Sequence, residues 1–524
     1  MKWITNAPWW LVSAGIHAVI LMGAALVIIE RAFAVDTPPI VVGLTDRPVK
    51  LPSDFPNARD LFDRKSLPSD QPDRSNNDDP VIWFPGAKPS NHNESANDRD
   101  SHDLFGKDPN ALAYILNGKD GHIGRTQGPN PGKAENIGVG NGGGSGGWRG
   151  RENGGGRENL VKVGGGGTVT ENAVKAALRW LARHQNSDGS WSASGFSHKC
   201  TDGKCSGAGE GDYDTGVTSL SLLAFLGAGY SQLSKDVEVD PAFPAQELRF
   251  GDVVKRALQW LVARQDPEGC VGERGQKYLY NHTIAALALS EAYGMTAAPI
   301  LLDPSQRAIN FVVASQNPGK GWRYSARGGD NDTSVTGWAV MALKSADLSG
   351  LQFPQSAYAG ALAWLNEATE QNGYYRVGYT QAATGKVYVP GKNEQFDHHE
   401  SMSAVAVMSK IFINKKRDAS LTSVNLIASD LPAWQPNKVD FYYWYYASLA
   451  LFQFDGPKGP FWSKWNEPMK KAITSNQKTA GCENGSWDPS ADRWGFEGGR
   501  VYAAAINALT LEVYYRYAHV FGTK

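Results

Sequence analysis

Residues 306–322 read Gln-Arg-Ala-Ile-Asn-Phe-Val-Val-Ala-Ser-Gln-Asn-Pro-Gly-Lys-Gly-Trp and begin the unit from which the folded part of this chain is built. The first eleven residues have apolar side chains at helical spacing, and a Gly/Pro turn follows them. A polar cluster at 328–333, Gly-Gly-Asp-Asn-Asp-Thr, then precedes a second, almost uncharged apolar segment at 334–343. We expect an outer helix, a turn with Gln and Trp, an acidic cap and a buried inner helix.

The unit recurs along the chain, and internal repeats decide the fold before other patterns do. Residues 178–191 carry Trp-Leu, Gln and Gly-x-Trp at the same spacing, and residues 258–269, 362–373 and 472–487 carry looser copies. The second segments begin near Asp214, His282, Asp332, His399, Asp440 and Arg500. We therefore predict about six helix pairs, the fifth with a weakly marked first helix at 421–428.

The Gln and Trp of each turn have a physical role to fill. The last carbonyl groups of a helix lack partners within the helix. We expect the Gln amide to cap these carbonyls, and the Trp to cover the amide and pack on the next helix.

Trp180-Leu181, Gln185, Gly189 and Trp191 resemble the repeat shared by squalene cyclases and protein prenyltransferase β subunits. The resemblance covers the chain from about residue 168 onward. It implies an all-α (α/α)6 toroid in which inner helices form a barrel, outer helices surround them, and a cavity opens at one end. The whole chain looks like membrane-anchored bacterial proteins with such repeats, a group without a settled activity.

Two regions precede the repeats. Residues 9–29 contain no full charge, and about 20 apolar residues suffice to cross a bilayer. We predict a transmembrane anchor within residues 1–35, a cleaved signal peptide being the alternative, with the bulk of the chain on the extracytoplasmic side. Residues 36–167 are rich first in Pro, Asp and Asn and then in Gly, which predicts a disordered linker before a folded domain at 168–524.

The four cysteines allow one structural prediction. Cys200 and Cys205 flank a short polar loop and are predicted to form a disulfide in an oxidising compartment. A metal knuckle is the weaker interpretation, because four ligands are needed and only His198 is close in sequence. The pairing of Cys270 and Cys482 stays open, and no metal or cofactor is predicted.

The starts of the inner helices are the predicted site. Parallel inner helices gather their N-terminal ends at one mouth of the barrel, where the positive helix ends favour carboxylates. Asp and Thr at these positions are equally good helix caps. The candidate catalytic residues are Asp330, Asp332 and His282. The predicted cavity residues are Asp214, Trp338, His399, Asp440, Tyr442, Tyr443, Trp444, Tyr446 and Arg500.

Three chemistries compete for this site. The resemblance implies alkene protonation by an Asp-x-Asp-Asp-Thr motif, but aligned on Thr333 the proton donor's position holds Asn331. It also implies zinc-dependent prenyl transfer, but no inner-helix start offers the matching Cys. A polysaccharide-acting (α/α)6 enzyme would use Tyr, His and Arg, which segments such as Tyr442–Tyr446 and Arg500 offer.

The near-neutral net charge of -1 gives no support for nucleic-acid binding. The prediction is a membrane-anchored toroid that binds an apolar isoprenoid-like ligand in a central cavity, with its conversion left open. The alternatives are a non-catalytic cell-envelope scaffold and a polysaccharide-acting enzyme.

Overall fold

The computed structural model describes residues 151, 155–200, 205–245, 247–275, 277–371, 375–383, 387–414 and 420–517. Within these ranges the chain forms fourteen α-helices and a single two-stranded sheet. The predicted anchor at 9–29 and most of the predicted linker lie outside the described residues. Among the helices that are described, none has the length and apolar character needed to cross a membrane.

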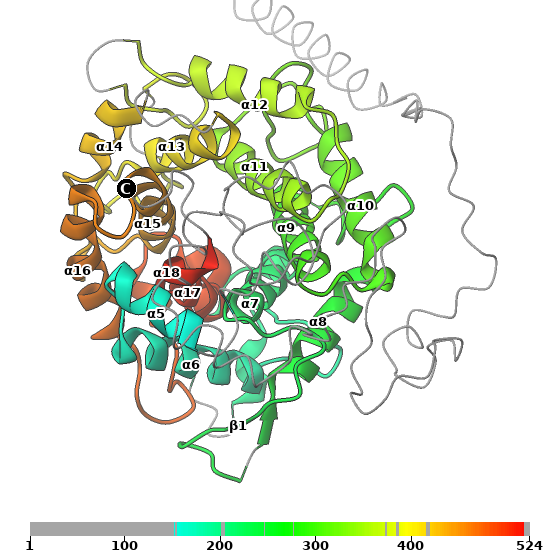
Figure 1. Cartoon of the computed structure of the whole chain (residues 1–524), viewed down its shortest axis with the longest axis vertical. Coiled ribbons are helices and arrows are strands. Elements are labelled where there is room, and N and C mark those ends of the chain that lie inside the picture. The colour runs from blue at the N-terminus through cyan, green and yellow to red at the C-terminus, as the bar shows by residue number, and fades with distance from the viewer. Residues whose placement is uncertain are drawn as a thin grey trace, which may run out of the picture. The chain divides into compact units, whose positions relative to one another are not determined.

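Six inner helices form a closed ring. They are α7 (Asp214–Gly227), α9 (Tyr278–Thr296), α11 (Thr333–Leu348), α13 (Ser401–Asn414), α15 (Phe441–Asp455) and α17 (Gly495–Leu511). Each inner helix packs on the next, and α17 packs on α7, which closes the ring (Figure 1). These helices are buried on almost every side because their sequences are apolar nearly all round.

Six outer helices surround this ring. They are α6 (Thr168–Arg183), α8 (Phe250–Ala263), α10 (Pro299–Ala314), α12 (Ser356–Glu367), α14 (Leu421–Ile427) and α16 (Pro460–Thr474). Most of them contact two consecutive inner helices. The last outer helix, α16, contacts the first, α6, so the outer layer is also closed at this point. The predicted all-α toroid of six helix pairs is confirmed, including the short first helix of the fifth pair.

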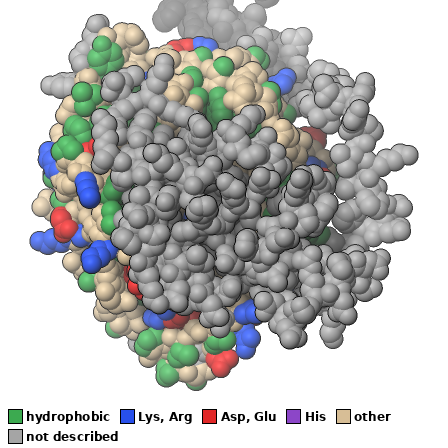
Figure 2. Space-filling model, viewed as in Figure 1, with side chains coloured by type: hydrophobic (Ala, Val, Ile, Leu, Met, Phe, Trp, Pro, Cys, Tyr) green, Lys and Arg blue, Asp and Glu red, His purple; other side chains and the backbone are tan. Residues whose placement is uncertain are grey.

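The remaining elements are short. The strands β1 (Val237–Val239) and β2 (Glu247–Arg249) pair antiparallel between α7 and α8. The 3-10 turns η5 (Phe196–Lys199), η6 (Gly211–Tyr213) and η8 (Pro489–Ala491) shape the loops before inner helices, and α18 (Val513–Arg516) follows α17. Where described residues are visible at the margin of the view in Figure 2, basic, acidic and hydrophobic side chains are intermixed.

The tryptophan of the repeat turn, rather than the glutamine, caps the outer helix. The indole Nε1 of Trp191 donates to the carbonyl of Leu181 at 2.7 Å, near the end of α6. Trp322 donates to Val312 at 2.7 Å in α10, and Trp487 donates to Ile473 at 2.8 Å in α16. These bonds satisfy carbonyl groups that the helix end leaves open. Our assignment of this role to the Gln was wrong.

The glutamine instead links neighbouring repeats. Gln185 Nε2 donates to the carbonyl of Gly189 in its own turn and to that of Val253 in the next outer helix, α8, at 3.0 and 2.9 Å. Gln265 and Gln316 repeat this pattern toward α10 and α12. Gln477 donates to the carbonyl of Ala173 in α6 at 2.8 Å. The same side chain therefore connects the last repeat to the first.

The glycine of the turn makes this contact possible. Gly189 has a φ of +97°, and a Cβ there would lie 2.2 Å from the carbonyl oxygen of Arg256 in α8. Gly485 has a φ of +96°, and its Cβ would lie 2.1 Å from the carbonyl oxygen of Ala176. Only glycine accepts both the left-handed backbone and the close approach of the next helix.

The folded domain begins before residue 168, which corrects the predicted linker boundary. The helix α5 (Gly155–Gly164) packs on α18 and buries Leu160 and Val161. These apolar side chains sit in a glycine-rich stretch, whose composition masked the short amphipathic segment.

Buried charges occupy the end of the barrel where the inner helices terminate. Arg151 pairs with Glu291 at 2.8 Å and donates to the carbonyl of Arg516, while Arg516 pairs with Glu291 at 2.9 Å. Arg157 donates to the carbonyl of Ala228, just past the end of α7. The guanidinium groups thus meet the negative helix ends.

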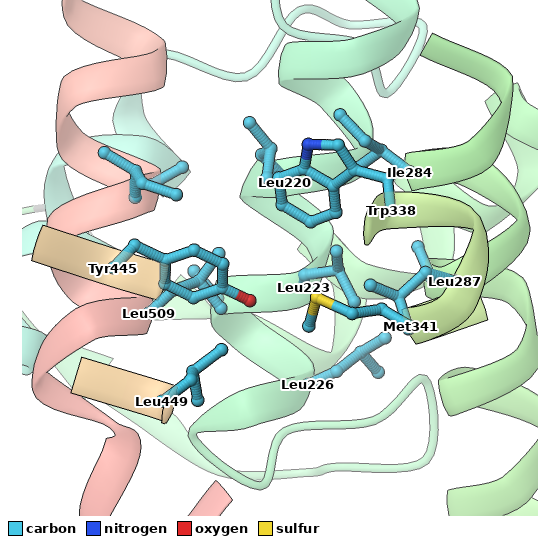
Figure 3. Packing of buried hydrophobic residues seen from close by; sticks show 14 of the residues in the cluster. Leu220, Leu223, Leu226, Ile284, Leu287, Trp338, Met341, Tyr445, Leu449 and Leu509 are labelled. Carbon is cyan, nitrogen blue, oxygen red and sulfur yellow. The ribbon is translucent and has the colours of Figure 1, made fainter. Parts of the chain in front are cut away.

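The middle of the barrel is filled by apolar side chains (Figure 3). Leu223, Leu287, Met341, Tyr445 and Leu509 come from five different inner helices and point toward one another. All five are almost completely buried. These side chains close the barrel at this level.

Candidate functional site

A cavity of about 220 Å³ lies at the N-terminal ends of the inner helices. All six inner helices contribute to its lining from their first turns: Val217, Tyr280, Ser334, Met402, Tyr442 and Glu497 are among these residues. This is the mouth that the antiparallel pairing of the helices predicted. Loop residues 387–389 and 493–494 complete the wall.

Aromatic side chains form much of the wall. Trp338 lines the cavity, as predicted, and its Nε1 donates to the hydroxyl of Tyr280 at 3.0 Å. Tyr442 also lines it, as predicted, and its hydroxyl lies 2.7 Å from Ser334 Oγ. Because these polar atoms bond to one another, the rings are held in place and present mainly apolar surface.

His399 lines the cavity and is oriented by a carboxylate. Its Nδ1 lies 2.5 Å from Asp430 Oδ2, and its ring stacks on Tyr443 with centroids 5.1 Å apart. The Nε2 atom is buried and has no hydrogen-bond partner among the described residues. Burial disfavours the charged imidazolium, but the bond to Asp430 and the neighbouring carboxylates raise the pKa of His399 above its ordinary value.

Two sets of charged groups at the rim are paired, while Arg493 donates to backbone carbonyls. Lys277 Nζ donates to the Tyr213 hydroxyl at 2.7 Å and to Glu497 at 2.9 Å, and all three residues line the cavity. Glu400 pairs with Arg376 at 2.8 Å and lies 3.5 Å from His398. A ligand at this mouth therefore meets compensated charges above an apolar floor.

Asp332 lies behind the wall and caps α11. Its Oδ1 accepts from the backbone N–H of Val335 at 2.7 Å, and its Oδ2 accepts from the Tyr379 hydroxyl at 3.3 Å. Burial raises the pKa of Asp332 to about 7, although the capping bond and Arg323 act in the opposite direction. Tyr379 is hydrogen-bonded to Tyr324, and both tyrosines line the cavity. A carboxyl group that is partly protonated near neutral pH is thus joined to the cavity wall by hydroxyl groups.

Asp330 is placed differently from the prediction. Its side chain is 76% exposed and pairs with Arg323 at 3.2 Å. It does not line the cavity. The residue lies in a surface loop before α11, where its charge is solvated.

His282 is a structural residue rather than a catalytic one in this structure. Its Nδ1 accepts from the backbone N–H of Val271 at 3.0 Å, and its Nε2 lies 3.1 Å from the carbonyl of Ala308 in α10. Burial lowers the pKa of His282 to about 4, so the ring is neutral at physiological pH. Both ring nitrogens are engaged in joining a repeat turn to the next outer helix.

Asp214 and Arg500 also serve local structure rather than the cavity wall. Asp214 accepts from the backbone N–H of Ala193 at 2.7 Å. Arg500 is fully buried, donates to the carbonyl of Ser206 at 2.7 Å and pairs with Glu483 at 2.8 Å. These contacts hold the loops before α7 and α17, as the capping interpretation allows.

The other predicted residues of α15 are buried behind the cavity. Asp440 caps the helix through the N–H of Tyr443 at 2.9 Å, and the Tyr443 hydroxyl donates to the carbonyl of Ile427 at 2.8 Å. Trp444 packs on Trp434 and Phe441. Tyr446 packs on Trp338 and supports the wall from behind. Only Tyr442 of this aromatic run lines the cavity.

Several site residues escaped sequence reasoning. Asp430 and Tyr379 come from loops that lie outside the repeat pattern, and Glu497 lies in the first turn of α17, before the predicted start near Arg500. Asp430 follows the poorly marked α14, so neither periodicity nor a motif pointed to it. The Lys277–Glu497 pair joins segments 220 residues apart, which a single sequence does not reveal.

The cysteines lie away from the cavity, and the predicted Cys200–Cys205 disulfide is absent: both are free thiols in the structure. Instead, their sulfur atoms lie 3.5 and 3.7 Å from His184 Nε2. Cys482 Sγ lies 3.5 Å from the same nitrogen. The sequence interpretation looked only at neighbours along the chain and so missed His184 and Cys482.

Residues 245–390 match the family model of the squalene-hopene cyclase C-terminal domain. This match confirms the resemblance to terpenoid cyclase-like repeats in that part of the chain. No curated protein matches the chain.

Solved structures with a similar chain path include the GH76A α-1,6-mannanase of Salegentibacter sp. HEL1_6. An inactive variant of it in complex with α-1,6-mannotriose is 9% identical with a TM-score of 0.43, covering 66% of this chain and 99% of that one. A second structure of the same mannanase is 9% identical with a TM-score of 0.44, covering 66% of this chain and 98% of that one. A novel α-amylase from Clostridium perfringens has 12% identity, a TM-score of 0.40 and coverages of 66% and 98%.

Proposed function

Because its central repeats are terpenoid cyclase-like, we propose that this protein binds an apolar, isoprenoid-like ligand in the cavity at the N-terminal mouth of its toroid. The observation that carries the proposal is the aromatic wall around Trp338, Tyr280 and Tyr442 at the point where all six inner helices converge. A concave apolar site with a few fixed polar groups is the usual form of a small-molecule site.

The size of the cavity limits the size of the ligand that it can hold. Sites for drug-sized ligands measure about 300–1,000 Å³, and this cavity measures about 220 Å³. The barrel below it is filled by side chains such as Leu223 and Met341 (Figure 3). We therefore propose a short isoprenoid, or one end of a longer chain, as the occupant.

The polar end of such a ligand would lie at the rim. Asn281, Ser334 and Glu400 line the cavity together with the paired charges of Lys277 and Glu497. A hydroxyl or ester group can exchange hydrogen bonds with these side chains while the hydrocarbon remains among the aromatic rings.

Two groups could serve acid–base chemistry if the ligand is converted. His399 is held by Asp430, and its Nε2 has no partner among the described residues. Asp332 has a raised pKa and reaches the wall through Tyr379. A general acid needs a pKa near the working pH; the pKa of Asp332 is about 7, and the pKa of His399 is raised by Asp430. Asn331 stands at the position of the family's proton donor, and its amide side chain cannot act as a general acid.

Membrane anchoring through residues 9–29 remains part of the proposal. An anchor and a glycine-rich tether would hold the toroid close to a bilayer, where isoprenoid-like molecules dissolve. Alkaline carbonate washing of cell membranes tests this step: retention in the pellet supports the anchor, and release into the supernatant contradicts it.

Binding can be tested with farnesol as the probe and with a variant that fills the cavity. Val217 lines the cavity from α7 and is 2% exposed. Val217→Phe should reduce the affinity at least tenfold in calorimetric titration of the purified full-length protein. The matched control is Val169→Phe, because Val169 is 66% exposed on the outer helix α6. The control should bind farnesol like the unchanged protein.

The same titration separates the alternatives. Binding of maltotriose but not farnesol would support a polysaccharide-acting enzyme. Binding of neither would support the scaffold. Equal binding of farnesol by both phenylalanine variants would place the ligand outside the cavity and contradict the proposal.

A further inference from the structure

A cluster of three cysteines and one histidine joins the first repeat to the last. His184 directly follows α6, Cys200 and Cys205 lie in the loop before α7, and Cys482 lies in the turn between α16 and α17. One ligand atom from each of the four residues lies within 4.8 Å of all the others. Three of the four side chains are buried.

The distances fit a tetrahedron around one metal ion. The His184 Nε2 atom lies 3.5, 3.7 and 3.5 Å from the sulfur atoms of Cys200, Cys205 and Cys482. With Zn–S bonds of about 2.3 Å and a Zn–N bond of about 2.0–2.1 Å, a tetrahedral N···S edge measures about 3.6 Å. The three N···S distances thus match the edges that zinc requires, and the sulfur atoms lie within 4.8 Å of one another.

The surroundings hold the histidine in the tautomer that binds a metal. His184 Nδ1 lies 2.8 Å from the carbonyl of Trp180 and donates its proton there, which leaves the Nε2 lone pair facing the sulfur atoms. The imidazole stacks on Trp180 with centroids 4.1 Å apart, and Phe196 packs against both rings. A backbone carbonyl on the second ring nitrogen is the usual support for a metal-bound histidine.

The arginine beside His184 holds the turn that carries Cys482. Three thiolates and a zinc ion carry a net charge of about -1. Arg183, next to His184, donates to the carbonyl of Asn484 at 2.9 Å, two residues beyond Cys482. Its guanidinium group also pairs with the buried carboxylate of Asp240, so it tethers the turn that carries Cys482 without supplying an unpaired positive charge to the cluster.

We propose that His184, Cys200, Cys205 and Cys482 bind one structural zinc ion that closes the toroid. Four protein ligands leave no open position for a substrate, so the site is structural rather than catalytic. The first and last repeats meet here, and the ion supplements the link that Gln477 makes to Ala173. Zinc would hold the ring closed independently of the ligand in the cavity.

The experiment is metal analysis of the full-length protein, purified in detergent through a tag that does not bind metal and without chelator. Inductively coupled plasma mass spectrometry should find about one zinc ion per chain. The Cys482→Ser variant should lose most of the bound zinc. Cys270→Ser is the matched control, since Cys270 is buried and free in the corresponding turn of the second repeat, and it should keep the zinc.

A second measurement covers the case in which Cys482→Ser fails to fold. The unchanged protein, stripped of metal and reloaded with Co²⁺, should show the intense visible bands of tetrahedral cobalt with a sulfur-to-metal charge-transfer band. Absence of zinc together with a Cys200–Cys205 or Cys205–Cys482 disulfide in non-reducing peptide mapping would overturn the proposal. Equal zinc loss in the Cys270→Ser control would overturn it as well.

Discussion

Single buried side chains in this protein often hold two segments together. His282 joins the Val271 N–H to the Ala308 carbonyl and must be neutral to accept from the former. Its folded-state pKa of about 4 lies below the unfolded value of about 6.5. The unfolded chain therefore binds more protons between these values, and the stabilising contribution of His282 is lost as pH falls through this window.

We expect urea unfolding to show this directly. Between pH 7 and pH 4, the unchanged protein should lose on the order of 3 kcal/mol through His282. His282→Gln should be less stable by about 1–3 kcal/mol at pH 7, since a buried N–H loses its acceptor, but should lack that pH-dependent component. Parallel stability curves for the two proteins would contradict this account.

The His399–Asp430 pair gives a second prediction for a single residue. Asp430→Asn removes the carboxylate 2.5 Å from His399 Nδ1, so the pKa of His399 should fall by about 1–3 pH units. Nuclear magnetic resonance of histidine-labelled protein measures the shift. His282, whose ring contacts the Ala308 carbonyl instead of Asp430, serves as the internal control and should keep its pKa of about 4.

At the scale of the elements, the turn tryptophans are hydrogen-bonded caps as well as packing groups. Trp322→Phe keeps an aromatic ring but leaves the Val312 carbonyl without its donor, and should lower the free energy of unfolding by about 1–3 kcal/mol. Trp364 is a matched control, because its buried Nε1 has no partner among the described residues. Trp364→Phe should cost clearly less, and equal costs would show that packing alone matters.

The helices and their pairing could be read from the sequence because each repeat carries an apolar period and a glycine turn. The roles of Gln and Trp could not, since both offer an N–H at the same turn and only the position of the next helix decides which carbonyl each reaches. The helix α5 was missed for a different reason: its few apolar residues lie within glycine-rich sequence.

The sequence predicted where the candidate site lies, but it predicted only some of the side chains that line it. Antiparallel pairing puts all inner-helix starts at one mouth, and Trp338, His399 and Tyr442 do line it. Asp214, His282 and Asp440 are at the predicted ends but turn toward neighbouring backbone. The direction of a side chain about the helix axis depends on packing that the sequence pattern does not specify.

The whole ring depends on contacts between residues far apart in sequence. Glu291 is fully buried and pairs with both Arg151 and Arg516, at the opposite end of the barrel from the cavity. Removing one partner of a buried ionic network leaves charge uncompensated and typically costs about 3–5 kcal/mol. Glu291→Gln should therefore lower the stability by that amount in chemical unfolding.

The control for this prediction is an exposed ion pair. Asp303 is 52% exposed in its pair with Arg307, and Asp303→Asn should change the stability by less than about 1 kcal/mol. Similar losses from the two substitutions would show that the buried network does not hold the closed end of the barrel.

The central claim is that the mouth of the toroid holds an isoprenoid-like ligand, and photocrosslinking tests it most directly. A farnesol analogue with a diazirine in its hydrocarbon tail would be irradiated with the full-length protein, and the labelled peptides mapped by mass spectrometry. The account predicts labels on the cavity walls near Val217, Tyr280, Trp338 and Tyr442, suppressed by excess farnesol and by Val217→Phe. Labels spread over the outer helices, unaffected by either, would contradict it.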